Sequence, residues 1–213
     1  MEQDGFYLAR IEQCLLESAE VKRQVVVRCK DSVLRAAQMI AETFSAGGKL
    51  LLCGNGGSAA DCQHMAAEFV GRFSKDLDRP GLPAVALTTD TSFITAFAND
   101  YGYEGVFERQ VKTLGNPGDV LIAISTSGNS MNIIRAVSAA TQKMIRTIAM
   151  TGNGGMLVGM ADAAIAIPST DTQRIQEAHL AVEHVLCDVV ESMLFRKVPQ
   201  EEAVYIGRRH DDY

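Results

Sequence analysis

The chain has 213 residues, of which 47% are hydrophobic and 22% are charged, and its formal net charge is −6. These values are typical of a globular protein with one substantial core, and the scattered basic residues argue against a nucleic-acid-binding face. No apolar run is long enough to cross a membrane, and the acidic start, Met1-Glu2-Gln3-Asp4, is not a signal peptide. The five cysteines form no Cys-x-x-Cys pair, so we expect neither a disulfide framework nor a cysteine zinc site, and we expect a cytoplasmic protein.

The beginning of the chain predicts a helical extension made of two amphipathic helices. Apolar residues recur at helical spacing over residues 6–29 and again over residues 31–44. We expect Asp31 or Ser32 to cap the second helix and Gly47-Gly48 to end it. The apolar stripes of such helices require packing partners, although periodicity alone permits a dimer as well as a larger assembly.

The rest of the chain alternates between strand-like and helix-like segments. Strands are predicted at 49–53, 84–88, 119–124, 146–151 and 163–167, and helices at 57–72, 92–99, 104–114, 130–143 and 172–195. Several strands are apolar on both faces, as central parallel strands between two helical layers must be. The sequence therefore predicts an α/β fold, with a doubly wound five-stranded parallel sheet flanked by helices and an N-terminal helical extension. We expect a single domain over residues 1–197, with its N-terminal helices inside residues 1–45, and a flexible tail over residues 198–213.

Two turns that follow predicted strands are rich in glycine and hydroxyl groups. They are Cys53-Gly54-Asn55-Gly56-Gly57-Ser58 and Ser125-Thr126-Ser127-Gly128-Asn129-Ser130, and each opens a predicted helix. The free backbone N–H groups and partial positive charge of a helix N-terminus favour an anion there. Many strand–helix junctions carry Gly and Ser only as turn and cap residues. Two turns of different design, each ending an apolar strand, favour a site for a phosphate or a sugar phosphate.

Two other polar turns carry less information. The segment Thr151-Gly152-Asn153-Gly154-Gly155 also follows a strand, but it has a single hydroxyl group, and we interpret it as an ordinary turn. Asn99-Asp100 precedes Tyr101-Gly102 at a predicted helix end. These are usual capping and turn residues, and they are equally suited to contact sugar hydroxyl groups.

Polar side chains on two predicted helices give a second signal. His64 and Glu68 are four residues apart, so they lie about 40° apart on one helix face. On the last helix, Gln176 and His184 lie about 80° apart, whereas His179 points about 140° away from His184, so one metal ion cannot easily take both histidines. A mixed His and Glu cluster is able to bind zinc. The alternatives are an exposed His–Glu pair and hydrogen-bonded histidines at a subunit interface.

Four motifs together resemble the phosphoheptose isomerase branch of the sugar-isomerase (SIS) domain superfamily. They are LCGNGGSAADCQHMAAE (52–68), ANDYGY (98–103), AISTSGNS (123–130) and RIQEAH (174–179), the last followed by His184. The resemblance extends to about residue 197 and implies an SIS-type fold. It also implies an aldose–ketose isomerase that converts sedoheptulose 7-phosphate to D-glycero-D-manno-heptose 7-phosphate, the first step toward activated heptose for lipopolysaccharide core or other surface glycans. Members are cytoplasmic homotetramers with active sites at subunit interfaces, and many bind zinc.

The resemblance also implies roles for individual residues. The acid/base pair is matched by Glu68 and His184, and the zinc ligands by His64, Glu68, Gln176 and His184. The phosphate-binding serines are matched by Ser58, Ser125, Ser127 and Ser130, and the sugar-contacting positions by Asn55, Gly56, Gly57, Thr126, Asn99 and Asp100; Glu68 and Gln176 are expected at the substrate as well. A neutral amide is a poor zinc ligand, so we expect a weak, exchangeable site, with one ion per subunit. Gln173 stands where some relatives have an acidic residue.

Three alternatives remain open from the sequence. The substrate is a different sugar phosphate, or the chain is a non-catalytic adaptor that resembles the replication-initiator-associating proteins, or it is a sugar-phosphate-sensing regulator. In the adaptors the two turns tend to read GNGTS and STRGNS, and the carboxylate and final histidine are missing. Here Gly57, Ser127, Glu68 and His184 all follow the enzymes. A regulator normally carries a fused DNA-binding segment, for which we expect no room in this chain.

Overall fold

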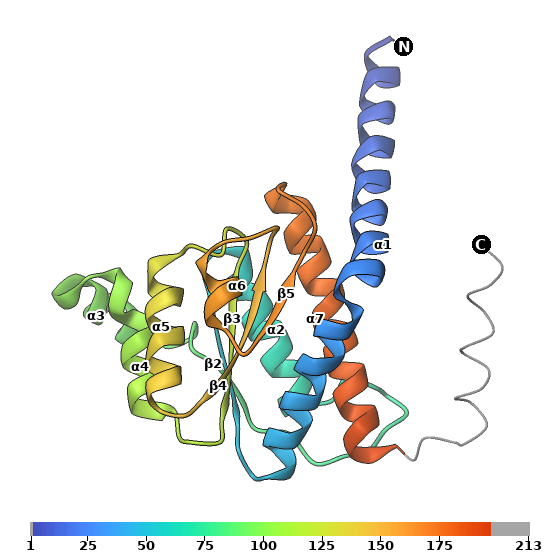
Figure 1. The fold of residues 1–213 in the computed structure, drawn as a ribbon. Coiled ribbons are helices and arrows are strands. Elements are labelled where there is room, and N and C mark those ends of the chain that lie inside the picture. Colours follow the sequence, from blue (N-terminus) through green and yellow to red (C-terminus); the bar gives the residue numbers. More distant parts are fainter. Residues whose placement is uncertain (1, 197–213) are drawn as a thin grey trace.

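Figure 1 shows the computed structural model of the chain, which describes residues 2–196. The elements are, in chain order, α1 (Glu2–Ser45), β1 (Leu50–Gly54), α2 (Gly57–Val70), β2 (Ala84–Ala86), α3 (Thr91–Tyr101), the 3-10 helix η1 (Tyr103–Gly105), α4 (Val106–Leu114), β3 (Val120–Ser125), α5 (Met131–Gln142), β4 (Arg146–Thr151), α6 (Met156–Met160), β5 (Ala163–Ala166) and α7 (Thr172–Phe195). The predicted tail over residues 198–213 lies outside the described residues, so its flexibility stays a prediction.

Five parallel strands form one sheet in the order β2-β1-β3-β4-β5. Leu51 of β1 pairs with Val85 of β2 and with Leu121 of β3, and Ile122 of β3 pairs with Ile148 of β4. Helices α1, α2 and α7 cover one face of the sheet, and α4, α5 and the short α6 cover the other (Figure 1). The predicted fold class, a helix-flanked five-stranded parallel sheet with an N-terminal helical extension, is confirmed.

The central strands contribute to two cores at once. Leu50 and Leu52 of β1 pack under α1, α2 and α7, whereas Leu51 and Cys53 pack under α4 and α5. This alternation follows from the two-residue period of a strand. Every residue of β1 and β3 is buried, as the apolar runs in the sequence predict.

Strands β1 and β3 are neighbours in the sheet although β2 separates them in the chain. From β1 the chain passes through α2 to β2, and it then returns through α3 and α4 to β3 on the other side of β1. At such a switch point the two strands lead into helices on opposite faces, which leaves a crevice where ligands bind. The two glycine- and hydroxyl-rich turns follow β1 and β3, so the fold places both of them at this crevice.

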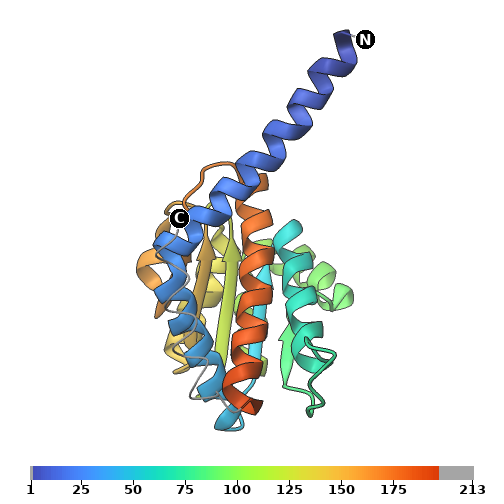
Figure 2. The ribbon, with the colours of Figure 1, turned by 90° about the vertical axis from the view of Figure 1, so that its right-hand side faces the viewer.

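The N-terminal extension is one helix, and the prediction of two helices is wrong. Helix α1 continues through Asp31 and Ser32, which therefore cap nothing, and it ends just before Gly47, whose φ of +80° is unfavourable for other residues. The helix continues because residues 30–32 contain neither Gly nor Pro, and because Cys29 and Val33 pack in the same core. Its first half projects beyond the sheet (Figure 2). Within residues 2–196, no helix is both long and apolar enough to span a membrane.

Helix α6 is absent from the sequence prediction. Residues 152–155 form a turn as expected, whereas Thr151 is the last residue of β4, and the turn opens this helix of five residues. Five residues are too few to show a helical period in the sequence. The strand predicted at 84–88 is also shorter, and the helix predicted at 104–114 begins as η1.

Replacing Ile122 by Ala tests the central position of β3. Ile122 has no exposed surface and lies between β1 and β4, so the substitution leaves a cavity and is expected to lower the free energy of unfolding by about 2–5 kcal/mol. Urea denaturation followed by circular dichroism measures the loss. The matched control is Val85→Ala in the edge strand β2, where the side chain is 40% exposed and the loss should stay below about 1 kcal/mol. Equal losses of stability in the two variants would contradict the central position of β3 in the sheet.

Candidate active site

The turn after β1 brings the start of α2 close to α7. Gly56 has a φ of +56°, and a Cβ atom on Gly54 would lie 2.5 Å from the backbone oxygen of Ser58. A Cβ atom on Gly57 would lie 2.5 Å from Nε2 of Gln176, which belongs to α7. Glycine at position 57 therefore allows the amide of Gln176 to reach the turn. The structure thus brings Gly57 and Gln176 together.

The turn after β3 gathers three hydroxyl groups. The Oγ atom of Ser125 lies 3.1 Å from that of Ser130 and 3.5 Å from that of Ser127. Gly128 has a φ of +65° and donates its N–H to the carbonyl of Ser125, which closes the turn. Ser58, the fourth predicted phosphate-binding serine, is buried in the first turn of α2, the helix that follows the neighbouring strand β1. Hydroxyl groups beside two helix N-termini are suited in their chemistry to hold an anion.

The two turns are linked by side-chain amides. Asn55 and Asn132 exchange two hydrogen bonds, of 3.0 and 2.8 Å, and the hydroxyl of Tyr103 donates to Asn55 Oδ1 at 3.0 Å. Asn132 is buried in the first turn of α5. Asn55 was predicted from its motif, whereas Asn132 and Tyr103 were not predicted. A polar residue among the apolar positions of α5 was the available signal for Asn132.

Helices α2 and α7 bring His64, Glu68 and His184 together within one chain. The Nε2 atoms of His64 and His184 are 2.8 Å apart, so one ring donates a hydrogen bond and the other accepts it. An oxygen of Glu68 lies 3.7 Å from Nε2 of His64. The side chains of His64 and Glu68 remain 41% and 23% exposed, so a ligand is able to reach them.

The metal prediction at His64, Glu68, Gln176 and His184 is not tested by this geometry. Imidazole and carboxylate groups are ligands that zinc prefers, and three of the four side chains share one corner. Gln176, however, precedes His184 by eight residues, or about 12 Å along the helix axis. Among the residues that the structure describes, no three His, Cys, Asp or Glu side chains are arranged to hold a metal ion as they stand. The four side chains are of types that zinc accepts, but in this structure they are not arranged around one point.

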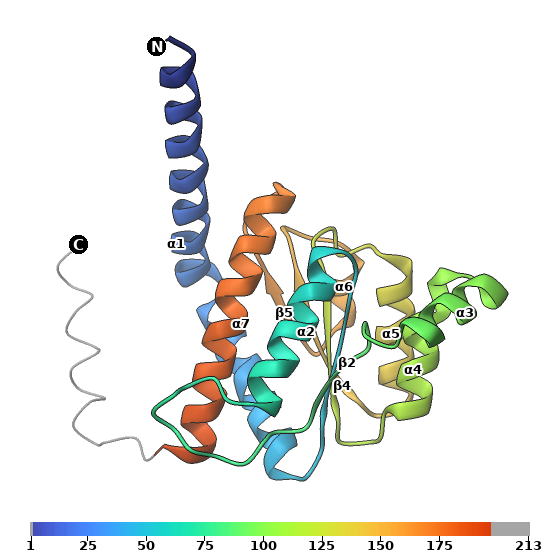
Figure 3. The ribbon, with the colours of Figure 1, turned by 180° about the vertical axis from the view of Figure 1, so that it is seen from behind.

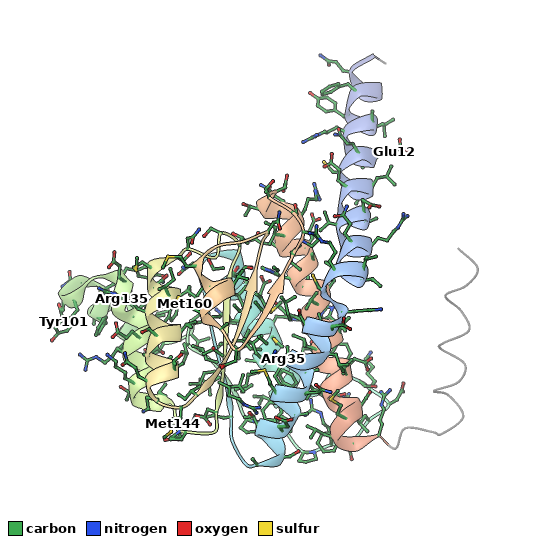
Figure 4. All side chains as sticks on the ribbon, in the orientation of Figure 1. Glu12, Arg35, Tyr101, Arg135, Met144 and Met160 are labelled. Atoms are coloured by element: carbon green, nitrogen blue, oxygen red, sulfur yellow. The ribbon has the colours of Figure 1, made fainter. Side chains whose placement is uncertain are left out.

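Asn99 and Asp100 are the two predicted residues that the structure does not bring to the turns. They lie near the end of α3, a helix without buried residues. Their side chains are joined by a hydrogen bond of 2.9 Å from Asn99 Nδ2 to Asp100 Oδ1. Tyr101, at the end of the same helix, lies far from the sheet (Figure 4).

A polar hollow of about 370 Å³ adjoins the turn after β3. It is lined by Thr126, Ser127, Asn129, Asn153, Gly154, Gly155, Ser169, Thr170, Thr172 and Ile175. The turn after β4, which the sequence suggested was an ordinary turn, forms one wall. It packs so closely that a Cβ atom on Gly155 would lie 2.5 Å from the carbonyl oxygen of Ser127. The consecutive glycines 154 and 155 were the signal for this close approach.

His179 and Glu183 are buried polar side chains of α7, the helix that also carries His184. His179 is bonded through Nε2 to the carbonyl of Thr151, and burial lowers its pKa to about 4, so the ring is neutral. His179 contacts Thr151 whereas His184 contacts His64, which agrees with the angle predicted between the two histidines on the helix. Glu183 has no exposed surface; burial and the nearby charge of Asp61 raise its pKa to about 8, so it is protonated at neutral pH.

Comparison with known proteins identifies relatives for most of the chain. The SIS domain family model matches residues 15–152. A phosphoheptose isomerase of Roseiflexus sp. (strain RS-1) is 54% identical over 181 residues, which cover 84% of this chain and 91% of that protein. The phosphoheptose isomerase of Aquifex aeolicus (strain VF5) is 52% identical over 188 residues, which cover 88% of this chain and 97% of that protein.

Solved structures show the same similarity. The phosphoheptose isomerase structure from Neisseria gonorrhoeae matches with a TM-score of 0.82 at 43% identity, covering 87% of this chain and 99% of that chain. The structure from Francisella tularensis matches with a TM-score of 0.83 at 37% identity, covering 87% of this chain and 98% of that chain. The identities exceed the level at which only a fold is shared, and the matches span nearly the whole of each relative. The chain therefore belongs to the phosphoheptose isomerase family of SIS-domain proteins.

Proposed function

We propose that this protein is an aldose–ketose isomerase that converts sedoheptulose 7-phosphate to D-glycero-D-manno-heptose 7-phosphate. The observation that carries the proposal is the meeting of His64, Glu68 and His184 on α2 and α7. Helix α2 begins at the switch-point crevice, and α7 reaches the turn before α2 through Gln176. The reaction is the first step of activated-heptose synthesis for lipopolysaccharide core or other surface glycans, and we place it in the cytoplasm. Family membership supports the reaction type.

The phosphate end of the sugar is held by hydroxyl groups. The cradle comprises Ser58, Ser125, Ser127 and Ser130, with the N-termini of α2 and α5 beside it. The phosphate is remote from the reacting carbons C1 and C2, so its binding energy serves to position the sugar. Backbone N–H groups and hydroxyls bind the anion without a Lys or Arg side chain in the cradle.

Proton transfer is assigned to Glu68 and His184. Moving the carbonyl between C1 and C2 requires a base that removes a carbon-bound proton and returns it to the other carbon, and Glu68 performs this step. His184 transfers the proton on oxygen, while the ring of His64, 2.8 Å away, fixes its orientation. A positioned acid or base of this kind contributes about 10²–10⁴-fold to the rate.

A zinc ion is proposed as the cofactor, with His64, Glu68, Gln176 and His184 as its ligands. When bound, it would act as a Lewis acid on the substrate carbonyl. The facing imidazole nitrogens and the neighbouring carboxylate support the choice of metal. A bound ion would replace the hydrogen bond between the two rings, and Glu68 would have to leave the ion in order to act as a base. The amide ligand and the separation of Gln176 from His184 along α7 support a weakly held, exchangeable ion.

The assembly is proposed to be a homotetramer with active sites at subunit interfaces. Support comes from the projecting half of α1, which exposes Phe6, Tyr7, Leu8, Ile11, Leu15 and Leu16. An apolar groove of about 370 Å³ between α1 and α7 gives a second exposed apolar surface. Exposed apolar surface of this extent is typical of protein interfaces. In such an assembly α3, which buries none of its residues in its own chain, would carry Asn99 and Asp100 to a neighbouring site.

Glu68→Gln is expected to lower kcat by about 10²–10⁴-fold while the KM for sedoheptulose 7-phosphate changes little, because the amide keeps the shape of the side chain but cannot accept the carbon-bound proton. An NMR assay in D₂O measures both turnover and deuterium uptake at C1 or C2. The control is Gln63→Glu on the exposed side of α2, which should retain activity. Full activity of Glu68→Gln would remove Glu68 from the mechanism.

Ser127→Arg is expected to raise KM at least about tenfold, a loss of about 1.4 kcal/mol of binding, because the long side chain enters the cradle. Steady-state kinetics with sedoheptulose 7-phosphate measure the change. Ser138→Arg, on the exposed face of α5, is the matched control and should leave KM unchanged. An unchanged KM in Ser127→Arg would contradict the phosphate cradle.

Protein treated with a chelator is expected to bind about one zinc ion per chain in a calorimetric titration. His64→Ala should weaken this binding at least about tenfold, since the loss of one imidazole leaves the ion with a poorer ligand set. Gln63→Ala, one residue away on α2, serves as the control and should bind zinc as the parent protein does. Equal zinc affinity in the His64→Ala variant would refute the proposed ligand set.

A further inference from the structure

The segment 71–83, which we call the strap, connects α2 to β2. It leaves the end of α2, passes the last turns of α7 and returns to the sheet (Figure 3). Within it, the side chain of Arg79 has no exposed surface, and it pairs with Glu191 of α7, whose side chain is 1% exposed. A fully buried ion pair inside a surface connection requires a physical explanation, because burial of both charges is costly.

Arg79 ties the strap to the end of α2. Its Nε donates to Glu191 Oε1 at 2.6 Å, its Nη2 donates to the carbonyl of Glu68 at 2.8 Å, and its Nη1 donates to the carbonyl of Phe69 at 2.8 Å. The last carbonyls of a helix have no partner within that helix. The guanidinium therefore holds the backbone of the proposed base, Glu68, against α7.

Glu191 ties the strap to α7. Besides Arg79, it accepts hydrogen bonds from the backbone N–H groups of Phe73 at 2.9 Å and Ser74 at 3.3 Å. Burial by itself raises the pKa of Glu191, but these N–H donors together with Arg79 outweigh it, so the pKa lies below its usual value and the group is ionised. The ring of Phe73, whose backbone is held in this way, lies 5.8 Å from the ring of His184.

The pair completes a series of contacts between α2 and α7. Gly57 contacts Gln176 at the start of the two helices, and His64 contacts His184 about two turns further on. Arg79 then joins Glu68 to Glu191, which follows His184 by seven residues, or about two further turns. The reacting groups are therefore enclosed between a contact at the turn and a contact at the strap.

We propose that Arg79 and Glu191, here called the clasp, are positioning residues for the isomerase, which fix Glu68 and His184 relative to each other across α2 and α7. The inference rests on the proposed function, because it assigns the acid and base to those two residues. Both clasp side chains are buried, so neither is assigned a contact with the sugar. Arg79 acts by holding the backbone of Glu68, and Glu191 acts by holding Phe73 beside the ring of His184.

The chain offers a matched control for each clasp residue. Asp119 is also a buried carboxylate, and it accepts from two backbone N–H groups, those of Lys49 and Asn116, and from the ammonium of Lys49, but it touches no site residue. Arg146 likewise donates to a helix carbonyl, that of Met39, and to the carboxylate of Glu42. Both lie at the other end of the sheet, at the starts of β3 and β4.

The kinetic test compares Glu191→Gln with Asp119→Asn, and Arg79→Lys with Arg146→Lys. Arg79→Lys keeps the charge opposite Glu191 but loses the planar fork that reaches two carbonyls, so it tests the clasp should Glu191→Gln fail to fold. Both clasp variants are expected to lower kcat at least about tenfold with KM for sedoheptulose 7-phosphate within about threefold. The controls should lose thermal stability while keeping kcat within about twofold. The proposal would be overturned if the folded clasp variants kept the kcat of the parent protein. It would also be overturned if control variants as stable as the clasp variants lost as much kcat as they do.

A second measurement does not depend on turnover. In protein with ¹³C-labelled histidine, the ring resonances of His184 should shift in the two clasp variants, because Phe73 moves relative to the ring, and should stay in place in the two controls. If the parent protein fails to convert the sugar while these shifts occur, the proposed substrate is wrong and the clasp stands. Unshifted His184 resonances would overturn the clasp whatever the activity.

Discussion

The close approach of α2 to α7 is the constraint on which the candidate site depends. The two helices begin at the same edge of the sheet and run side by side, so positions along one face the other in order. Gly57 lies against Gln176, and His64 lies against His184 at 2.8 Å. A wider separation would leave each imidazole as an isolated surface group, because a hydrogen bond between side chains does not survive a shift of 1 Å.

The order of the strands in the sheet positions the two glycine- and hydroxyl-rich turns. Because β1 and β3 are adjacent but lead to helices on opposite faces, their following turns converge on one crevice. One turn gives the start of α2 and the other gives the hydroxyl groups of Ser125, Ser127 and Ser130. The hydroxyl groups proposed for the phosphate and the ionisable groups proposed for proton transfer thus come from different elements that a single topology brings together.

The sequence was sufficient where a local pattern decides the structure. Apolar runs placed the five strands, and the spacing of His64 and Glu68 placed both side chains on one face of α2. It was insufficient at Asp31, where packing of the flanking residues overrides a capping signal, and at α6, which is too short to have a period. Arg79 lies in a segment without periodicity, and Glu191 is one charged residue among several on α7. Their pairing depends on the path of the strap in space, which no local pattern encodes.

The absence of a side chain at position 57 separates what the fold needs from what the site needs. Even the first carbon of a side chain there would stand 2.5 Å from Nε2 of Gln176, which is the far end of a flexible side chain. A residue other than glycine would therefore turn that amide away from the first turn, while the backbones of α2 and α7 could keep their places.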